Sequence, residues 1–97
     1  MFDIEESSVY AEWCRSLRDR KARGFITARL FRLANGNIGD ARPVGDGVSE
    51  LRLHFGPGYR IYFTRRDTRI VFLLCGGDKG SQSRDVARAK QIASGLE

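Results

Sequence analysis

Two alternating segments separated by a short turn place the strongest constraint on how this chain can fold. In residues 50–55 and 59–64, apolar side chains occupy every second position, and Gly56-Pro57-Gly58 lies between the two segments. A period of two predicts strands that are buried on one side, and a glycine-proline-glycine sequence predicts a turn. The two segments therefore predict an antiparallel hairpin whose apolar side chains face a core and whose polar side chains face away from it.

The segment before this hairpin begins with a predicted strand and a first helix. Residues 2–5 alternate apolar and polar side chains, as a short strand does. In residues 9–17, apolar side chains recur at four-residue intervals, which predicts a helix with one apolar stripe. Ser7 and Ser8 precede this stripe, and serine oxygens are favoured N-caps.

Four further elements complete the predicted order along the chain. The helical pattern begins again near Asp19, and apolar spacing over residues 22–33 predicts a second helix. This helix should end with Gly36 in the left-handed conformation. Residues 37–47 are rich in glycine and have no periodicity, which predicts a loop. After the hairpin, the more continuously apolar residues 69–75 predict an interior strand, and residues 84–94 predict a closing helix.

These elements predict an α+β fold in a single domain over residues 1–97. We expect a short N-terminal strand, a helical hairpin on one face of an antiparallel sheet with a three-stranded meander, and a short C-terminal helix. A length of 97 residues leaves no room for a second core. The content of 41% hydrophobic and 30% charged residues is typical of globular proteins and excludes the disordered class.

Composition also narrows the compartment and the chemistry. The longest apolar run, residues 70–75, is far shorter than the roughly 20 residues needed to span a bilayer, so we expect no membrane partner. The acidic N-terminus differs from the basic start of a signal peptide, and we expect a cytoplasmic protein. Cys14 and Cys75 lie in apolar contexts, which favours two buried free thiols over a disulfide. With one histidine, they are too few for a structural zinc site.

The positive charge is concentrated in the predicted helical hairpin. The chain carries 17 Lys and Arg against 12 Asp and Glu, a net charge of +5. Residues 1–12 hold four acidic and no basic residues, whereas residues 15–32 hold seven basic residues against Asp19 alone. Such a one-sided face favours a nucleic acid over an ordinary solvated helix surface, which remains the alternative. The residues that we expect to bind RNA or the ribosome are Arg15, Arg18, Arg20, Lys21, Arg23 and Arg29.

A second cationic set belongs to the predicted hairpin of strands. Because strand side chains alternate, Arg52 and His54 share one side of the first strand, and Arg60 and Tyr62 share one side of the second. The core-facing positions are apolar, so this set is expected on an open sheet face, where like charges repel unless an anion binds. The alternative is an ordinary exposed face in which Glu50 neutralises one arginine.

A glycine-rich segment after the last strand places one more cation near this face. Residues 76–81 read Gly-Gly-Asp-Lys-Gly-Ser but lack the spacing of a nucleotide-binding phosphate loop. The segment does put Lys79 just beyond the end of the predicted interior strand. We therefore expect Lys79 at the rim of the cationic sheet face.

The order of elements and three sequence pieces together resemble the RelE/ParE toxin superfamily, in the branch of addiction-module killer proteins. The pieces are Glu50-Leu51-Arg52, Gly58-Tyr59-Arg60-Ile61-Tyr62-Phe63 and Leu73-Leu74-Cys75-Gly76-Gly77-Asp78-Lys79. The resemblance covers essentially the whole chain. It implies the toxin of a type II toxin–antitoxin module, in which RelE-like members are ribosome-dependent endoribonucleases that cut mRNA and inhibit translation.

The resemblance also implies the partners and the residues of the site. The partners would be the ribosome with its mRNA and a cognate antitoxin, which we expect to be a helix-turn-helix protein encoded by the adjacent gene. Catalysis would use positioned cationic side chains with no metal and no other cofactor. The strand arginine of the family matches Arg60, the basic residues of the preceding strand match Arg52 and less closely His54, and the following basic residue matches Lys79.

This chain departs from the family at two places. Many members carry lysines on the first meander strand, where this chain has Arg52 and His54. Several members also carry a histidine or tyrosine near the C-terminus, where this chain has neither.

The residue types alone are suited to RNA cleavage by a 2′-hydroxyl on its neighbouring phosphate. Histidine is the residue type whose unperturbed pKa lies near neutrality, so His54 is the candidate base or acid. Arg52 and Arg60 stay protonated and would clamp the phosphate, and Lys79 is a second clamp or the acid. Tyr62 would stack on a base or donate a hydrogen bond.

Two other functions remain open at this stage. One is a ParE-like inhibitor of DNA gyrase, which has the same fold and needs no nuclease chemistry. The other is a basic protein of the same fold that is not toxic. The cluster of His54 with Arg52 and Arg60 favours the nuclease, because gyrase inhibition needs no such cluster.

Overall fold

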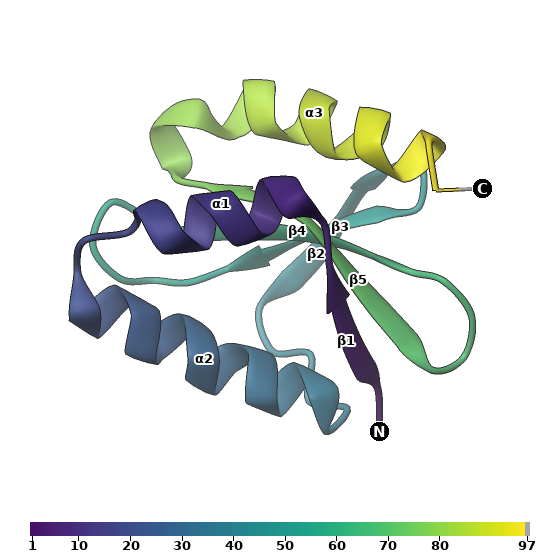
Figure 1. Ribbon diagram of the computed structural model, residues 1–97, viewed down its shortest axis with the longest axis horizontal. Helices are drawn as coiled ribbons and strands as arrows, with labels where there is room; N and C mark the ends of the chain where they lie inside the picture. Colours follow the sequence, from purple (N-terminus) through teal and green to yellow (C-terminus); the bar gives the residue numbers. More distant parts are fainter. Residues whose placement is uncertain (97) are drawn as a thin grey trace.

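A five-stranded mixed sheet separates two layers of helices (Figure 1). The computed structural model describes residues 1–96. The elements are β1 (Asp3–Glu6), α1 (Ser8–Ser16), α2 (Arg20–Ala34), β2 (Ala41–Gly45), β3 (Val48–Arg52), β4 (Arg60–Arg65), β5 (Ile70–Gly77), the 3₁₀ helix η1 (Lys79–Ser81) and α3 (Gln82–Ser94). The strand order is β1-β5-β4-β3-β2, in which β1 runs parallel to β5 and the other neighbours are antiparallel. The predicted α+β class is confirmed.

The helices α1 and α2 begin and end where their caps are found. The side chain of Ser7 accepts a hydrogen bond from the backbone of Tyr10, and that of Asp19 accepts from Lys21 and Ala22. Gly36 follows α2 with a φ of +90°, which confirms the predicted left-handed stop. Both helices pack on the sheet face that carries Leu51, Ile61, Phe63, Val71 and Leu73.

The opposite sheet face is covered by α3, which corrects the expectation of an open face. Val48, Tyr62, Phe72 and Leu74 form a second core with Ala89 of α3. The reason lies in β5, whose continuous apolar run places apolar side chains on both faces of the sheet. A strand of this kind needs cover on both sides. Glu50, Arg60 and Tyr62 on this face are therefore buried with the second core, whereas Arg52 at the end of β3 is only partly buried.

The segment over residues 37–47, expected to be a loop, contains the edge strand β2. Asp46 and Gly47 form its turn to β3, with φ of +55° and +76°. Two successive positive φ angles match the tight turn that favours Asp-Gly in hairpins. Pro43 is compatible with an edge strand because one side of β2 makes no ladder hydrogen bonds. The Asp46-Gly47 pair was thus the signal for this hairpin.

The first predicted hairpin strand is shorter than its alternation indicated. β3 ends at Arg52, so His54 and Phe55 belong to the connection between β3 and β4. This connection leads through the predicted turn, where Gly58 donates its backbone N–H to the carbonyl of Phe55 at 3.1 Å. His54 is consequently free of the sheet ladder and points to a different neighbourhood from Arg60.

The remaining predictions concern the thiols and the membrane. Both cysteines are free, as expected; Cys75 is buried in the second core, whereas Cys14 is only partly buried, which corrects the expectation of two buried thiols. Burial raises the pKa of the Cys75 thiol to about 11. Within residues 1–96, we find no helix with the length and apolar character required to cross a membrane.

Candidate functional site

A cleft of about 320 Å³ lies between α2 and the connection from β3 to β4. It brings together side chains that are far apart in the sequence. Its lining residues are Phe25, Arg29 and Arg32 of α2, Gly39 and Asp40 of the following connection, and Arg52, Leu53, His54 and Phe55. The two cationic sets that the sequence places on separate elements therefore meet in this cleft, through Arg29 on one side and through Arg52 and His54 on the other.

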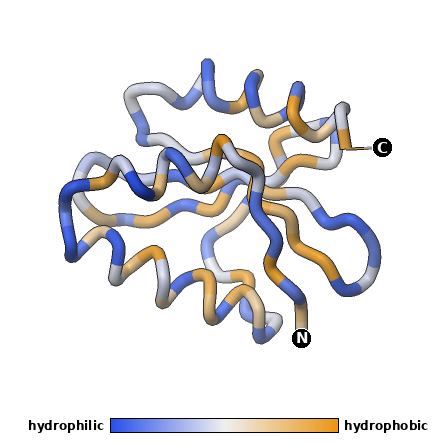
Figure 2. The backbone as a smooth tube through the Cα atoms, in the orientation of Figure 1, coloured by the Kyte–Doolittle hydropathy of each residue, from blue (hydrophilic) through white to orange (hydrophobic). Residues whose placement is uncertain are grey.

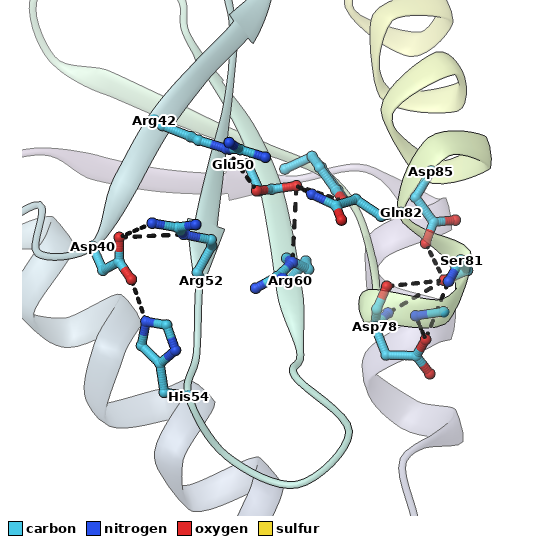
Figure 3. A network of polar contacts seen from close by, with 12 residues as sticks. Asp40, Arg42, Glu50, Arg52, His54, Arg60, Asp78, Ser81, Gln82 and Asp85 are labelled. Carbon is cyan, nitrogen blue, oxygen red and sulfur yellow. Dashed lines mark hydrogen bonds and ion pairs between the residues drawn. The ribbon is translucent and has the colours of Figure 1, made fainter.

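Asp40 lies between Arg52 and His54 and contacts both (Figure 3). Its Oδ1 accepts hydrogen bonds from Arg52 Nη2 at 2.8 Å and from Arg52 Nε at 3.3 Å, and its Oδ2 contacts His54 Nε2. The hydrogen bonds from Arg52 and then from His54 hold the pKa of Asp40 below its ordinary value. Asp40 is thus ionised at neutral pH.

This contact orients the imidazole of His54. An ionised carboxylate only accepts hydrogen bonds, so Nε2 of His54 carries the hydrogen that it shares with Asp40. In the neutral ring, Nδ1 is then left as a proton acceptor. The side chain of His54 is 73% exposed, so this second nitrogen is accessible from solvent. The Asp40–His54 pair therefore has the arrangement of an oriented general base.

The α2 side of the cleft carries positive charge without a matching carboxylate. Arg29 Nη2 donates to the carbonyl oxygen of Ile38 at 3.3 Å, and its guanidinium lies against Gly39. Burial, followed by the nearby charge of Arg32, lowers the pKa of Arg29. Among residues 1–96, neither of these arginines forms an ion pair. Together with Arg52, they leave an excess of two positive charges over Asp40, which favours an anionic ligand.

Gly39 is required for this approach of Arg29. It has a φ of +69°, and a Cβ there would lie 2.4 Å from Arg29 Nη1. Both the backbone conformation and the space therefore favour glycine. The glycine immediately before Asp40 thus allows the α2–β2 connection to bring Arg29 and Asp40 into the same cleft.

Arg60 does not lie on an open face, which corrects the sequence-based expectation. It is directly opposite Arg52 in the register of β3 and β4, but it is only 8% exposed. Its Nε lies 3.9 Å from Oε2 of Glu50 and makes no hydrogen bond with the described residues. The expected open face is wrong because α3 covers this side of the sheet, and the alternative in which Glu50 neutralises an arginine matches the Arg60–Glu50 pair. The role of Arg60 as a phosphate clamp stays a prediction.

Glu50 is the centre of a buried polar network under α3 (Figure 3). It accepts hydrogen bonds from Tyr62 Oη at 3.0 Å, Gln82 Nε2 at 2.8 Å and Arg42 Nε at 3.3 Å. These partners come from β2, β4 and α3. A buried carboxylate needs such partners because an unpaired charge is costly away from water. Glu50 therefore connects the covered sheet face to α3.

Tyr62 is part of this network and not of an exposed surface. It is fully buried, and burial together with its hydrogen bond to Glu50 raises its pKa. A phenol in this position is inaccessible to a nucleobase. The expected open position of Tyr62 is therefore wrong, because α3 covers the face on which it lies.

Lys79 lies beside the hairpin turn and does not line the cleft. Its backbone N–H donates to the carbonyl of Pro57 at 3.4 Å, and its side chain is exposed. The preceding Asp78 accepts hydrogen bonds from Gly80 N at 2.8 Å and Ser81 N at 3.2 Å. The glycine-rich segment thus forms the capped start of η1, which leads directly into α3.

Apart from Arg29, the residues expected to bind RNA or the ribosome gather around the connection between α1 and α2, which is hydrophilic in Figure 2. We call this the basic turn; it consists of Arg15, Arg18, Arg20, Lys21 and Arg23, all exposed. Arg23 Nη2 donates to the carbonyl of Arg15 at 3.0 Å, which ties the two helices together. The carboxylate of Asp19 at the N-cap of α2 supplies the negative charge that the helix dipole favours there, and it balances only one of these five cations. Such an arrangement favours an external anion.

Sequence reasoning singled out only Arg29, Arg52 and His54 among the nine lining residues, and of the other six, three contribute most to the site. Asp40 lies in a segment without periodicity, where an isolated aspartate carries no signal. Phe25 and Phe55 were assigned to the core by their spacing, yet Phe25 is 50% exposed and contacts Phe55 in the cleft. Only the approach of α2 to the β3–β4 connection reveals these three residues as neighbours.

Comparisons with known proteins connect the chain to a family. The model of the phage-derived protein Gp49-like family matches residues 12–94. That family is commonly of the RelE-like toxin type, which supports a toxin-like protein. The chain is also similar to an uncharacterized protein of Haemophilus influenzae, with 41% identity over 93 residues. The alignment covers 96% of this chain and 94% of the relative.

Proposed function

The chain belongs to the phage-derived protein Gp49-like family, and we propose that it is a toxin that cuts mRNA on the ribosome. One observation carries this proposal: Asp40 orients His54 beside Arg52, at the edge of a cleft with excess positive charge. A base, a cation and space for an anion are what cleavage by a 2′-hydroxyl requires. A membrane ligand or a protein partner alone would give no reason for an oriented imidazole.

The proposed reaction breaks the RNA backbone without an external nucleophile. Nδ1 of His54 takes the proton of a 2′-hydroxyl, and the resulting oxygen forms a bond to the adjacent phosphorus. The bond from phosphorus to the 5′-oxygen breaks, and that oxygen takes up a proton. The products are a 2′,3′-cyclic phosphate and a 5′-hydroxyl end. Asp40 stabilises the imidazolium that forms during the transfer, as a buried carboxylate does in hydrolase triads.

The cations have separate roles in this proposal. Arg52 stabilises the charge that develops on the phosphate oxygens, and the guanidinium fork suits two of them. Lys79, beside the hairpin turn, supplies the proton for the 5′-oxygen or acts as a second clamp. Arg60 contributes positive potential from its position opposite Arg52 on β4. The basic turn contacts phosphates of ribosomal RNA and so positions the protein without reading sequence.

The biological partners follow from this activity. We propose a type II toxin–antitoxin module in which a neighbouring gene encodes a helix-turn-helix antitoxin that keeps the toxin inactive in the cytoplasm. Expression of the chain alone is then expected to arrest growth and translation, and co-expression of the neighbour to relieve the arrest. Normal growth with confirmed expression of folded protein would contradict the toxin function.

The experiment that tests the chemistry is primer extension on mRNA from induced cells, combined with cleavage on programmed ribosomes. We expect breaks at defined codon positions with the wild-type protein, and none with His54→Ala. The matched control is Arg69→Ala, because Arg69 is an exposed residue of the β4–β5 connection, away from the cleft. If the mRNA stays intact and the protein inhibits purified gyrase, the nuclease function is wrong and the protein is a gyrase inhibitor.

A further inference from the structure

We propose that the aromatic side of the cleft is a binding site for one unpaired nucleobase, stacked on Phe25, with its phosphate on Arg29 and Arg32. The proposal rests on the proposed function only for its place next to the cleaved phosphate. The binding site itself follows from the exposed ring, the unpaired arginines and the size of the cleft. Its ligand is a nucleotide of single-stranded RNA.

A row of aromatic rings holds Phe25 in position. The ring centroids of Phe25 and Phe55 are 4.6 Å apart, and those of Phe55 and Tyr59 are 6.5 Å apart with nearly parallel planes. Trp13 of α1 packs on Tyr59 at 6.2 Å in turn. One end of this row reaches the interior, whereas Phe25 at the other end is half exposed. A ring that is held by one aromatic neighbour and remains half exposed offers surface on which a base can stack.

The arginines supply the complementary charge at the same place. Arg29 is oriented by its hydrogen bond to the carbonyl of Ile38 and retains further N–H groups for an anion. Arg32 lines the same wall one helical turn later. The single carboxylate of the cleft, Asp40, is already occupied by Arg52 and His54. The α2 wall is therefore suited to a phosphate.

The dimensions select a single-stranded ligand. At about 320 Å³, the cleft is at the lower end of the roughly 300–1,000 Å³ that small-ligand sites occupy, so it holds one nucleotide and no duplex. Proteins that recognise unpaired RNA commonly stack its bases on aromatic rings. Stacking tolerates all four bases, because each presents a flat aromatic face. We therefore expect this site to position the RNA with little base preference.

Fluorescence anisotropy with a labelled six-nucleotide RNA tests the site without the ribosome. We expect Phe25→Ala and Phe25→Leu to weaken binding about tenfold, the loss expected for one stacked base. Phe31→Ala is the matched control, since Phe31 lies on α2 with 70% exposure but outside the cleft, and should change binding less than twofold. Thermal melting of each variant verifies that the fold is retained.

A second RNA, with one base replaced by an abasic ribose, completes the test. When the abasic ribose falls at the stacked position, we expect this RNA to bind the wild type about tenfold more weakly than the complete RNA does. The Phe25→Ala variant should bind the abasic and the complete RNA with equal affinity. Arg29→Gln should weaken the binding of both RNAs equally, because Arg29 contacts the phosphate and not the base. Equal affinities for Phe25→Ala and Phe31→Ala, or no effect of the abasic position anywhere in the RNA, would overturn the proposal. Binding of an apolar peptide with the same Phe25 dependence, and of no RNA, would assign the cleft to a protein partner instead.

Cleavage assays separate this inference from the proposed function. If RNA binding follows the expected pattern but programmed ribosomes release no cut mRNA, the base site stands and the nuclease is wrong. If ribosomes release cut mRNA while Phe25→Ala binds and cuts like the wild type, the nuclease stands and the base site is wrong.

Discussion

Arg52 and Arg60 lie directly opposite one another on β3 and β4, yet each is paired with a different carboxylate. Arg52 turns to Asp40 at the edge of the cleft, and Arg60 turns to Glu50 beneath α3. The first pair is partly exposed, whereas the second is almost completely buried. Two like charges in neighbouring strand positions are thus compatible with a stable sheet, and the two arginines differ in what their removal would cost.

The first prediction compares these two arginines. Arg60→Ala should lower the stability of the fold by about 1–3 kcal/mol, because it leaves a buried carboxylate with one partner fewer. The loss stays moderate, since Glu50 keeps its hydrogen bonds from Tyr62 and Gln82. Arg52→Ala should change the melting temperature little, because exposed ion pairs contribute little. Denaturant unfolding of both variants is the measurement, and equal stability of the two variants would contradict the burial of Arg60.

The second prediction concerns the orientation of His54. In Asp40→Asn, the new amide can donate to Nε2 and so favours a hydrogen on Nδ1, which removes the proposed base. Single-turnover cleavage on programmed ribosomes should fall by about two to four orders of magnitude, as when the aspartate of a catalytic triad is replaced. The control is Asp46→Asn, which keeps a residue type that tolerates a positive φ and lies in the β2–β3 turn. A cleavage rate like that of the control would show that Asp40 does not act on His54.

The third prediction is a pH dependence of stability. The pKa of Asp40 lies below its ordinary value of 3.8 in the folded state. Its contribution to stability is therefore complete above that ordinary value and is lost as the pH falls through the lowered folded value. The stability difference between wild type and Asp40→Asn should be constant near neutral pH and shrink in acid. Urea unfolding of both proteins between neutral and acidic pH measures this difference in unfolding free energy. A difference that grows on acidification would contradict the prediction.

The fourth prediction tests the basic turn. Replacement of Arg18, Arg20 and Arg23 by glutamate should weaken ribosome association and reduce its salt dependence. If each arginine contacts one phosphate, the slope of log affinity against log salt should fall by roughly two to three. The control reverses Arg66, Arg69 and Arg84, which are exposed on other surfaces. Sedimentation with ribosomes over a range of salt gives the slopes, and equal slopes for the two triple variants would make the basic turn a solvated surface.

Local patterns were sufficient for most of the fold. The serine at position 7 and the aspartate at position 19 cap the two helices, and Gly36 ends the second, because these effects act within one turn of helix. The alternation in residues 59–64 predicted β4, and the apolar run in residues 69–75 predicted an interior strand. The edge strand β2 was missed, although Asp46-Gly47 indicated its turn.

The placement of the site depended on contacts between elements that no local pattern contains. The sequence by itself determined which residues are cationic, that the three meander strands pair, and that Arg60 lies near Arg52, since these follow from side-chain chemistry and a period of two. Only the tertiary structure decided that α3 buries Arg60 and Tyr62, and that α2 brings Arg29 and Phe25 to the cleft. The physical reason is that burial depends on which apolar faces meet. An alternating strand shows the same pattern whether its polar side faces water or a helix with its own polar partner.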